Sequence, residues 1–156
     1  MTREILFRAK DINNNWAYGS YFKHIKRQIC PIGNDSLKEE DIEHLIIRDC
    51  FADWNMPKEI ECVRIKPDTV GQYIGLEAKR EAKIFEDDII KFFYNNKKYY
   101  RAIKYSMGEY GVLIEGECIS MEANFLTIAD LIGYVGCDLE VVGNIYDNKE
   151  LLESEE

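Results

Sequence analysis

The sequence predicts a mainly β fold, and three observations support this prediction. Ten tyrosines and seven phenylalanines among 156 residues favour strands, because aromatic rings pack well on a half-buried pleated surface. Short segments of alternating polarity are separated by Asn, Asp and Gly, and only one long stretch has a helical period. We therefore expect one unit over residues 1–156, made of an N-terminal β-hairpin lobe and a small SH3-like or OB-like barrel.

The N-terminal lobe, residues 1–70, is expected to begin with a hairpin. Residues 3–10 and 16–22 alternate between apolar and polar side chains, and the run DINNN at residues 11–15 is a strong turn signal between them, because Asn tolerates left-handed backbone. Gly19 interrupts the second strand, which indicates a bulge or the close approach of another backbone. A further strand is expected over residues 60–66.

A helix is predicted over residues 37–51, as an insertion into this lobe. Ser36 and Glu39 have the spacing of a capping box, in which a hydroxyl and a carboxylate satisfy free N–H groups at a helix start. Four apolar residues then share one face at a 3.6-residue spacing: Ile42, Leu45, Ile46 and Cys50. We expect this to be the one long helix, with short helical turns elsewhere.

The C-terminal small barrel is expected over residues 84–146. Strands at 89–94, 99–105 and 110–115 are separated by short segments with turn chemistry, so they form a meander. Thr127 and Asp130 form a second capping pattern that predicts a short helix. Residues 138–146 read as a closing strand and residues 147–156 as an acidic tail. Any division between the lobes is expected within residues 67–83.

The charge and the cysteines of the chain disfavour nucleic-acid binding and a disulfide-linked secreted protein. The net charge of −9 disfavours a general nucleic-acid binder, whose affinity comes mainly from neutralising phosphates. The five cysteines are odd in number and form no C-x-x-C pair, so we expect free thiols in a reducing compartment. Charges stand at the N-terminus where a secretory signal would need an apolar core, so we expect no such signal, and no apolar run reaches the ~18 residues of a membrane span. We therefore expect a cytoplasmic protein that does not contact the membrane.

No pattern in the sequence predicts catalysis. Glu86, Asp87 and Asp88 are adjacent carboxylates that suit Mg²⁺ or Ca²⁺, but neighbours on an extended chain point to opposite faces. The two histidines, His24 and His44, lie on different predicted elements, and no nucleophile, phosphate-loop or dinucleotide motif accompanies them. We expect a protein that is not an enzyme and holds no cofactor or metal; an enzyme of an unrecognised kind is the remaining alternative.

One segment, residues 97–105, interleaves four cations with tyrosines and contains no acid. Stacked rings flanked by Lys and Arg are a common way of holding single-stranded nucleic acid on a barrel face. Alternation places Tyr100 and Lys104 on one face of the strand, and Ile103 marks the other face as inward, which leaves few rings for stacking. A core strand with a solvated edge is the favoured interpretation, and a nucleic-acid platform around Tyr100 and Lys104 is the alternative.

Three boxes, in order along the chain, resemble the YopX family, small proteins of unknown function encoded by bacteriophages, prophages and related mobile elements. They are REILFRA at 3–9 with WAYG at 16–19, then TVGQYIGL at 69–76 with IFEDDIIK at 84–91, and VGNIYDN at 142–148. The resemblance implies a predominantly β fold with a barrel-like portion, a phage or mobile-element setting, and no catalytic residues. The signature residues matched here are Gly71, Gln72, Tyr73, Gly75, Leu76, Glu86, Asp88, Gly143 and Asn144.

The chain departs from the family pattern at two backbone positions. Arg80 and Glu81 stand where the family turns on Asn-Gly, and Asp87 stands where the family has Gly. Because both lost glycines serve backbone geometry, we expect a helical turn at the first place and a left-handed Asp87 at the second.

We expect the chain to act as a non-catalytic protein-interaction module in the bacterial cytoplasm. The hairpin carries rings on both sides, with Trp16 and Tyr18 on one and Tyr21 on the other. One side can pack on the core, and the other is expected to pack on a second copy, since soluble chains commonly bury such patches by symmetric contact. The expected partners are a second copy or a host or phage protein. A single-stranded nucleic-acid-binding barrel is the alternative function.

Overall fold

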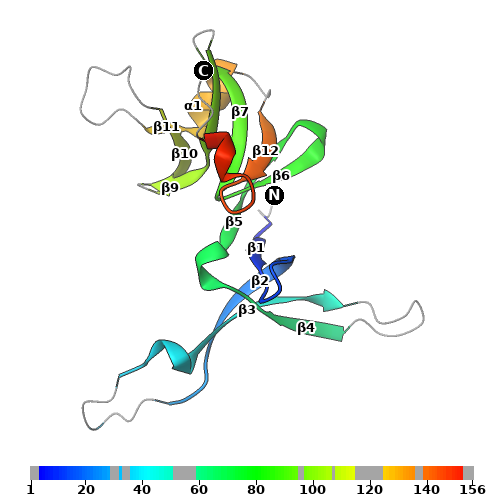
Figure 1. The fold of residues 1–156 in the computed structure, drawn as a ribbon, viewed down its shortest axis with the longest axis vertical. Helices are drawn as coiled ribbons and strands as arrows, with labels where there is room; N and C mark the ends of the chain where they lie inside the picture. The colour runs from blue at the N-terminus through cyan, green and yellow to red at the C-terminus, as the bar shows by residue number, and fades with distance from the viewer. Residues whose placement is uncertain are drawn as a thin grey trace. The chain divides into compact units, whose positions relative to one another are not determined.

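The structure is a computed structural model that describes residues 4–28, 32, 36–50, 59–94, 97–106, 108–114, 125–135 and 139–152. These residues form twelve strands, one α-helix and four short 3-10 helices, which confirms the mainly β fold (Figure 1). The chain divides into two compact units. We call Ile5–Gln72 the N-terminal unit, and Met1–Glu4 with Tyr73–Glu156 the C-terminal unit. No helix among the described residues is long and apolar enough to cross a membrane.

The N-terminal unit is an antiparallel sheet in the order β4-β3-β2-β1. Its strands are β1 (Phe7–Lys10), β2 (Trp16–Ile25), β3 (Ile42–Cys50) and β4 (Glu59–Arg64), followed by a 3-10 turn, η2 (Pro67–Thr69). The predicted hairpin is confirmed: Asp11 Oδ1 accepts hydrogen bonds from the backbone N–H of Asn13 and Asn15 at 2.7 and 2.8 Å. Asn14 takes the left-handed conformation that the turn requires, with φ 67°.

The predicted helix over residues 37–51 is wrong. A single 3-10 turn, η1 (Glu39–Asp41), is followed by β3, which pairs with β2 on one side and β4 on the other. Ser36 does not cap a helix; its carbonyl accepts a hydrogen bond from Arg27 Nη2 at 3.0 Å. The β-branched side chains of this segment fit a pleated surface, and pairing with two distant strands outweighs the local helical spacing. Residue 51 lies outside the described residues.

The core of the N-terminal unit is small. Its buried residues are Ala9, Ala17, Ile46 and Ile65, with Phe7, Tyr21, Val63 and Val70 packed against them. Gly19 marks the close approach that the sequence predicted: a Cβ there would lie 2.3 Å from the Ile47 carbonyl oxygen. Strand β5 (Gly71–Ala78) begins in this unit, where Gly71 and Gln72 pair with β1.

In the C-terminal unit, β5 continues and pairs with β6 (Ala82–Phe85). The segment between them, η3 (Lys79–Glu81), has a non-helical backbone at Arg80, with φ 65° and ψ 28°, so the predicted helical turn is wrong. Arg80 and Glu81 take positive φ values of 65° and 60°, at the positions where the family pattern has Asn-Gly. The backbone geometry of that turn is thus retained without glycine.

The remaining strands of this unit form two three-stranded sheets, in the orders β12-β7-β8 and β11-β10-β9. Their bounds are β7 (Asp88–Tyr94), β8 (Lys97–Ala102), β9 (Lys104–Ser106), β10 (Glu109–Leu113), β11 (Phe125–Thr127) and β12 (Glu140–Asn144). The predicted strand 99–105 is broken at buried Ile103, because β8 pairs with β7 while β9 pairs with β10. Together with the sheet that contains β1–β6, the described residues form three sheets, and these do not make a closed barrel.

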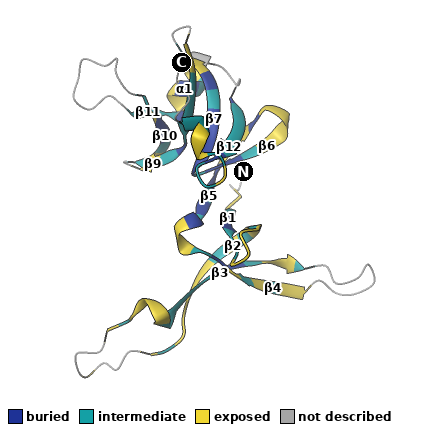
Figure 2. Ribbon diagram, viewed as in Figure 1, coloured by how far each residue is buried: buried dark blue, intermediate teal, exposed yellow. Residues whose placement is uncertain are grey.

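The short predicted helix is confirmed as α1 (Ile128–Val135). Thr127 caps it: its Oγ1 accepts the Asp130 N–H at 3.1 Å and donates to the Asp130 carboxylate at 2.7 Å. The unit's buried core is shared by strands and helix: Ile74, Ala78, Ile84, Ile90, Phe92, Ile103, Val112, Ile128, Leu131 and Leu139 (Figure 2). The 3-10 helix η4 (Lys149–Leu152) lies within the segment predicted as an acidic tail, whose residues 153–156 are not among those described.

Candidate functional site

The face of β2, β3 and β4 that points away from the core carries an exposed apolar strip. Strand register places Phe22 beside Leu45, and Ile47 beside Cys62, on this side of the sheet. Tyr18, Phe22 and Ile60 are 45%, 49% and 73% exposed. Figure 2 shows β4 largely exposed. We call this strip the outer face; it consists of Tyr18, Phe22, Leu45, Ile47, Ile60 and Cys62.

Polar and cationic groups surround the outer face. At one end Arg64 Nη2 and Glu43 Oε1 form an ion pair at 2.8 Å, and the His24 ring stacks on Phe22 with centroids 6.3 Å apart. At the other end the Arg8 guanidinium lies 4.8 Å from the Trp16 ring centroid. Ser20 and Asp49 also lie on this face, opposite Ile47 and Ile60 in the strand register. A mixture of apolar and polar groups is typical of protein interfaces.

The structure separates the aromatic residues that the sequence proposed for this surface. Trp16 and Tyr18 lie on the side of the outer face, since they pair with Lys10 and Arg8 across β1. Tyr21 points to the core: its hydroxyl lies 2.6 Å from His44 Nδ1, and its ring packs on Phe7 at 5.7 Å. Tyr21 is therefore not part of the exposed strip.

Sequence reasoning missed the contributions of β3 and β4 to the outer face. Leu45 and Ile47 were hidden by the predicted helix, and Ile60 and Cys62 join them only through the β3–β4 register. Alternation within residues 60–64 was the one available signal, because it places Ile60 and Cys62 on the same side.

The signature residues gather around a second feature, the turn between β6 and β7. Asp87 has φ 66°, as predicted from the missing glycine. Its carboxylate binds Lys104 Nζ and accepts a hydrogen bond from the Tyr146 hydroxyl at 2.8 Å, and its carbonyl accepts a hydrogen bond from the Ile145 N–H at 3.1 Å. The side chain thus ties the turn to β9 and to the end of β12.

The neighbouring signature residues also serve the backbone. Asp88 is 1% exposed, and its Oδ2 accepts the Phe85 N–H at 2.7 Å. Asn144 Oδ1 accepts the N–H groups of Tyr146 and Asp147, both at 3.0 Å. A Cβ at Gly143 would lie 2.4 Å from the Asn148 side-chain oxygen. These contacts show that Asp88 in the motif IFEDDIIK, and Gly143 and Asn144 in the motif VGNIYDN, have structural roles.

The glycine box in β5 has a similar structural role. Gly71 and Gln72 pair with β1, and the Tyr73 ring packs on Phe85 with centroids 5.7 Å apart. Gly75 has φ 89°, a conformation that favours glycine, within the irregular part of the β5–β6 register. Leu76 is 37% exposed.

The groups that the sequence offered for chemistry do not converge. Among the described residues, no group of three or more His, Cys, Asp and Glu is placed to hold a metal ion. Glu86 is adjacent to Asp87 and Asp88, whose carboxylates bind the partners described above. His44 lies next to Tyr21 on the core side of the sheet, whereas His24 lies on the outer side.

The residues of the alternative nucleic-acid platform, Tyr100 and Lys104, make contacts with different partners. Lys98 Nζ lies 5.0 Å from the Tyr100 ring centroid, but Lys104 binds Asp87. Lys91, opposite Tyr100 in the sheet, forms a 2.9 Å ion pair with Glu140. Hydrogen bonding to the Glu140 carboxylate raises the pKa of Lys91, and the same contact lowers the pKa of Glu140. Tyr100 and Lys104 therefore belong to different sheets, and Lys104 is bound to a carboxylate of its own unit.

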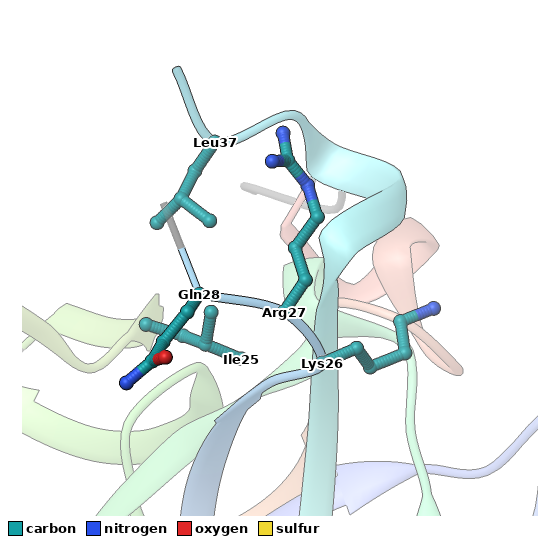
Figure 3. Close-up of a pocket in the computed structure, with 5 residues that line it drawn as sticks. All are labelled: Ile25, Lys26, Arg27, Gln28 and Leu37. Atoms are coloured by element: carbon teal, nitrogen blue, oxygen red, sulfur yellow. The ribbon is translucent and has the colours of Figure 1, made fainter. Parts of the chain in front are cut away.

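A pocket of about 560 Å³ lies at the end of β2 (Figure 3). It is lined by Ile25, Lys26, Arg27, Gln28 and Leu37, and Lys26 points away from Ile25 and Leu37. Arg27 Nε forms a 2.8 Å ion pair with Asp41. Among the described residues, the lining contains no carboxylate, thiol or imidazole that could act as a general acid, a general base or a nucleophile of the usual kinds.

The described residues form a mainly β protein, and the motif residues found in it contact the backbone or pack against neighbouring strands. The family profile described as "YopX protein" matches residues 6–153. The chain therefore belongs to the YopX family. The crystal structure of protein EF1440 from Enterococcus faecalis is similar over 97% of this chain and 99% of that chain, with 20% identity and a TM-score of 0.47. The comparison with curated proteins finds no match.

Proposed function

We propose that this YopX-family chain is a non-catalytic protein-interaction module, and that the outer face of the N-terminal unit is its contact surface. The observation that carries the proposal is the exposure of Tyr18, Phe22 and Ile60 on one side of a three-stranded region. Contiguous apolar patches on soluble proteins mark sites of association more often than single exposed residues do.

The exposed apolar area would supply part of the free energy of such a contact. Fully burying a large apolar side chain gains about 1.5–3 kcal/mol. Covering the exposed parts of Tyr18, Phe22 and Ile60 would thus gain about 2.5–5 kcal/mol, against a cost of association of about 4–15 kcal/mol that further contacts must offset. The half-buried Leu45 and Ile47 between them would add to this gain, and the ion pair at Arg64 would remain at the rim.

The setting of this function is the bacterial cytoplasm, with a host protein, a protein of the encoding element or a second copy as partner. The support is the family resemblance together with the distribution of polar groups. Asp88 and Asn144, two polar residues of the signature, each accept a backbone hydrogen bond, which favours a structural role for them over a catalytic one.

Co-purification with matched variants tests the proposal. Tagged wild-type chain, a Phe22→Ser/Ile60→Ser variant and an Ile12→Ser/Leu113→Ser control would be expressed in a bacterial host at equal levels. The control removes two side chains of similar exposure, 70% and 53%, that belong to neither proposed surface. We expect proteins retained by wild type and control to be depleted at least tenfold on the outer-face variant. Equal retention by all three would refute the outer face as the contact surface.

Single-stranded nucleic-acid binding is the second candidate, and the observation that favours it is a small cluster on β7 and β8. Phe93 is 58% exposed and pairs with Lys98, whose ammonium lies over Tyr100. The negative net charge of the C-terminal unit disfavours binding to a phosphate backbone, because this unit carries ten Lys and Arg against eighteen Asp and Glu. Fluorescence anisotropy with labelled oligonucleotides at low salt decides: micromolar binding lost in Tyr100→Ser would support this function, and no binding would exclude it.

A further inference from the structure

We propose that a second copy of the chain pairs with the free edge of β4, antiparallel and in a register centred on Cys62. This inference goes beyond the proposed function, because it uses the edge of the sheet and leaves the outer face open to a partner. Among the described residues, β4 is the outermost strand of its sheet. A sheet edge presents unpaired N–H and C=O groups, which form a template for another strand.

The hydrogen-bonding phase of β4 identifies the groups on that edge. The Ile65 N–H donates to the His44 carbonyl at 3.0 Å, so residue 65 faces β3. Because antiparallel ladders alternate, residues 63, 61 and 59 also direct their backbone groups to β3. Ile60, Cys62 and Arg64 therefore direct theirs to the free edge. Beyond Arg64 the edge ends, since the Lys66 N–H donates to the Lys10 carbonyl at 2.8 Å.

Only one register uses all three of these residues without bringing like charges together. Centring on Cys62 pairs Ile60 with Arg64 of the partner and allows about six backbone hydrogen bonds. Centring on Glu61 gives about four, and it places two Glu61 carboxylates opposite each other, which is destabilising. Centring on Val63 also gives about four, because the strand runs out at Arg64.

The charges of β4 do not oppose this pairing. Glu61 and Arg64, which flank the centre, are each bound to β3 of their own chain, through Arg48 and Glu43 at 2.8 Å. Residues 5–72 carry ten Lys and Arg against eleven Asp and Glu, so two N-terminal units meet with little net repulsion. The pair would continue the outer face from one copy into the next, because a two-fold axis normal to a sheet keeps both outer faces on the same side.

Oxidative cross-linking tests the register directly. Directly opposite residues of a hydrogen-bonded antiparallel pair have Cα atoms about 5.5 Å apart, within the ~4.4–6.8 Å that a disulfide needs. Two variants would be compared, one with Cys62 as sole cysteine and one with Cys50 as sole cysteine. Diamide accepts the two electrons and two protons as the thiols join. We expect the Cys62 chain to form a covalent dimer at least tenfold faster than the Cys50 chain at micromolar concentration. Equal rates, or the same rate in denaturant, would overturn the proposal.

Sedimentation under reducing conditions separates edge pairing from contact through the outer face. Cys62→Pro removes an edge N–H without removing a β3–β4 hydrogen bond, and we expect it to be monomeric and folded by circular dichroism. Cys62→Ser keeps the backbone and should still dimerise, as should Phe22→Ser. Dimerisation lost in Phe22→Ser but kept in Cys62→Pro would overturn edge pairing in favour of face-to-face contact. A wild-type chain that is monomeric at about 100 μM would overturn both. If Cys62→Pro fails to fold, the cross-linking comparison decides alone.

Discussion

The two units differ in how completely each covers its apolar residues. The described core of the C-terminal unit contains ten buried apolar residues, whereas that of the N-terminal unit contains four. The C-terminal unit also carries nearly all of the net charge, with ten basic against eighteen acidic residues, while the N-terminal unit is almost neutral. The comparison indicates that more apolar area is buried within the C-terminal unit, and that one face of the N-terminal sheet, the one proposed as a contact surface, is less well covered.

The largest expected effect is the loss of a core ring in the C-terminal unit. Phe92 is 1% exposed and stacks on Tyr99 with ring centroids 5.6 Å apart. We expect Phe92→Ala to lower the free energy of unfolding by about 3–5 kcal/mol, because it leaves a cavity that the surrounding strands cannot fill. Urea denaturation followed by tyrosine and tryptophan fluorescence measures this change. A loss below about 1 kcal/mol would contradict the assignment of this core.

A smaller effect is expected at the corner that the signature builds. Asp87→Ala removes the partner of Lys104 and Tyr146 and leaves alanine in a left-handed conformation, with an expected cost of about 3 kcal/mol. Asp87→Asn keeps an acceptor and a residue that tolerates positive φ, so it should cost about 1 kcal/mol. Urea midpoints of the two variants check the order, and equal midpoints would show that the carboxylate contacts contribute little.

Substitution of the outer face should leave the fold almost unchanged. Phe22 is about half buried and Ile60 about a quarter buried, so Phe22→Ser is expected to lower the free energy of unfolding by about 1 kcal/mol and Ile60→Ser by about 0.5 kcal/mol. Binding of an apolar fluorescent dye should fall in the same variants. A loss of stability comparable to that of Phe92→Ala would mean that this face is part of the unit's own core.

The smallest effect concerns the ion pair between Lys91 and Glu140. Because Lys91 lowers the pKa of Glu140, the pair stabilises the fold above the unfolded pKa of Glu, near 4.3, and this contribution is lost as the pH falls through the lower folded value. Glu140→Gln should therefore be slightly less stable than wild type at pH 7, and the two stabilities should converge in acid. Thermal melts from pH 7 to pH 3 provide the test, in which a constant difference would contradict the linkage.

Local chemistry was sufficient where a single turn or glycine decides the structure. The hairpin turn at residues 11–15, the close approach at Gly19 and the positive φ of Asp87 follow from properties of Asn, Gly and Asp that act within a few residues. The cap at Thr127 belongs to the same class.

Long-range pairing decided the features that the sequence did not predict. Residues 42–50 have both a helical spacing and a β-branched run, and only the register with β2 and β4 selects the strand. The same register brings Leu45, Ile47, Ile60 and Cys62 together on the outer face, and a helix over residues 37–51 does not predict this arrangement. The sequence prediction placed Tyr21 on the surface, whereas the structure places it on the core side. Alternation along a strand separates its two faces but does not show which face meets the core.

The central claim, that a partner covers the outer face, is tested most directly by thiol labelling inside cells. Ser20 is exposed between Tyr18 and Phe22, and Glu109 is exposed in the C-terminal unit. In chains whose native cysteines are replaced by serine, Ser20→Cys and Glu109→Cys would each be labelled with a small maleimide in living bacteria and in dilute purified protein. The account predicts labelling at least tenfold slower in cells than in dilution at position 20, after normalisation to position 109. Equal normalised rates in the two settings would contradict it.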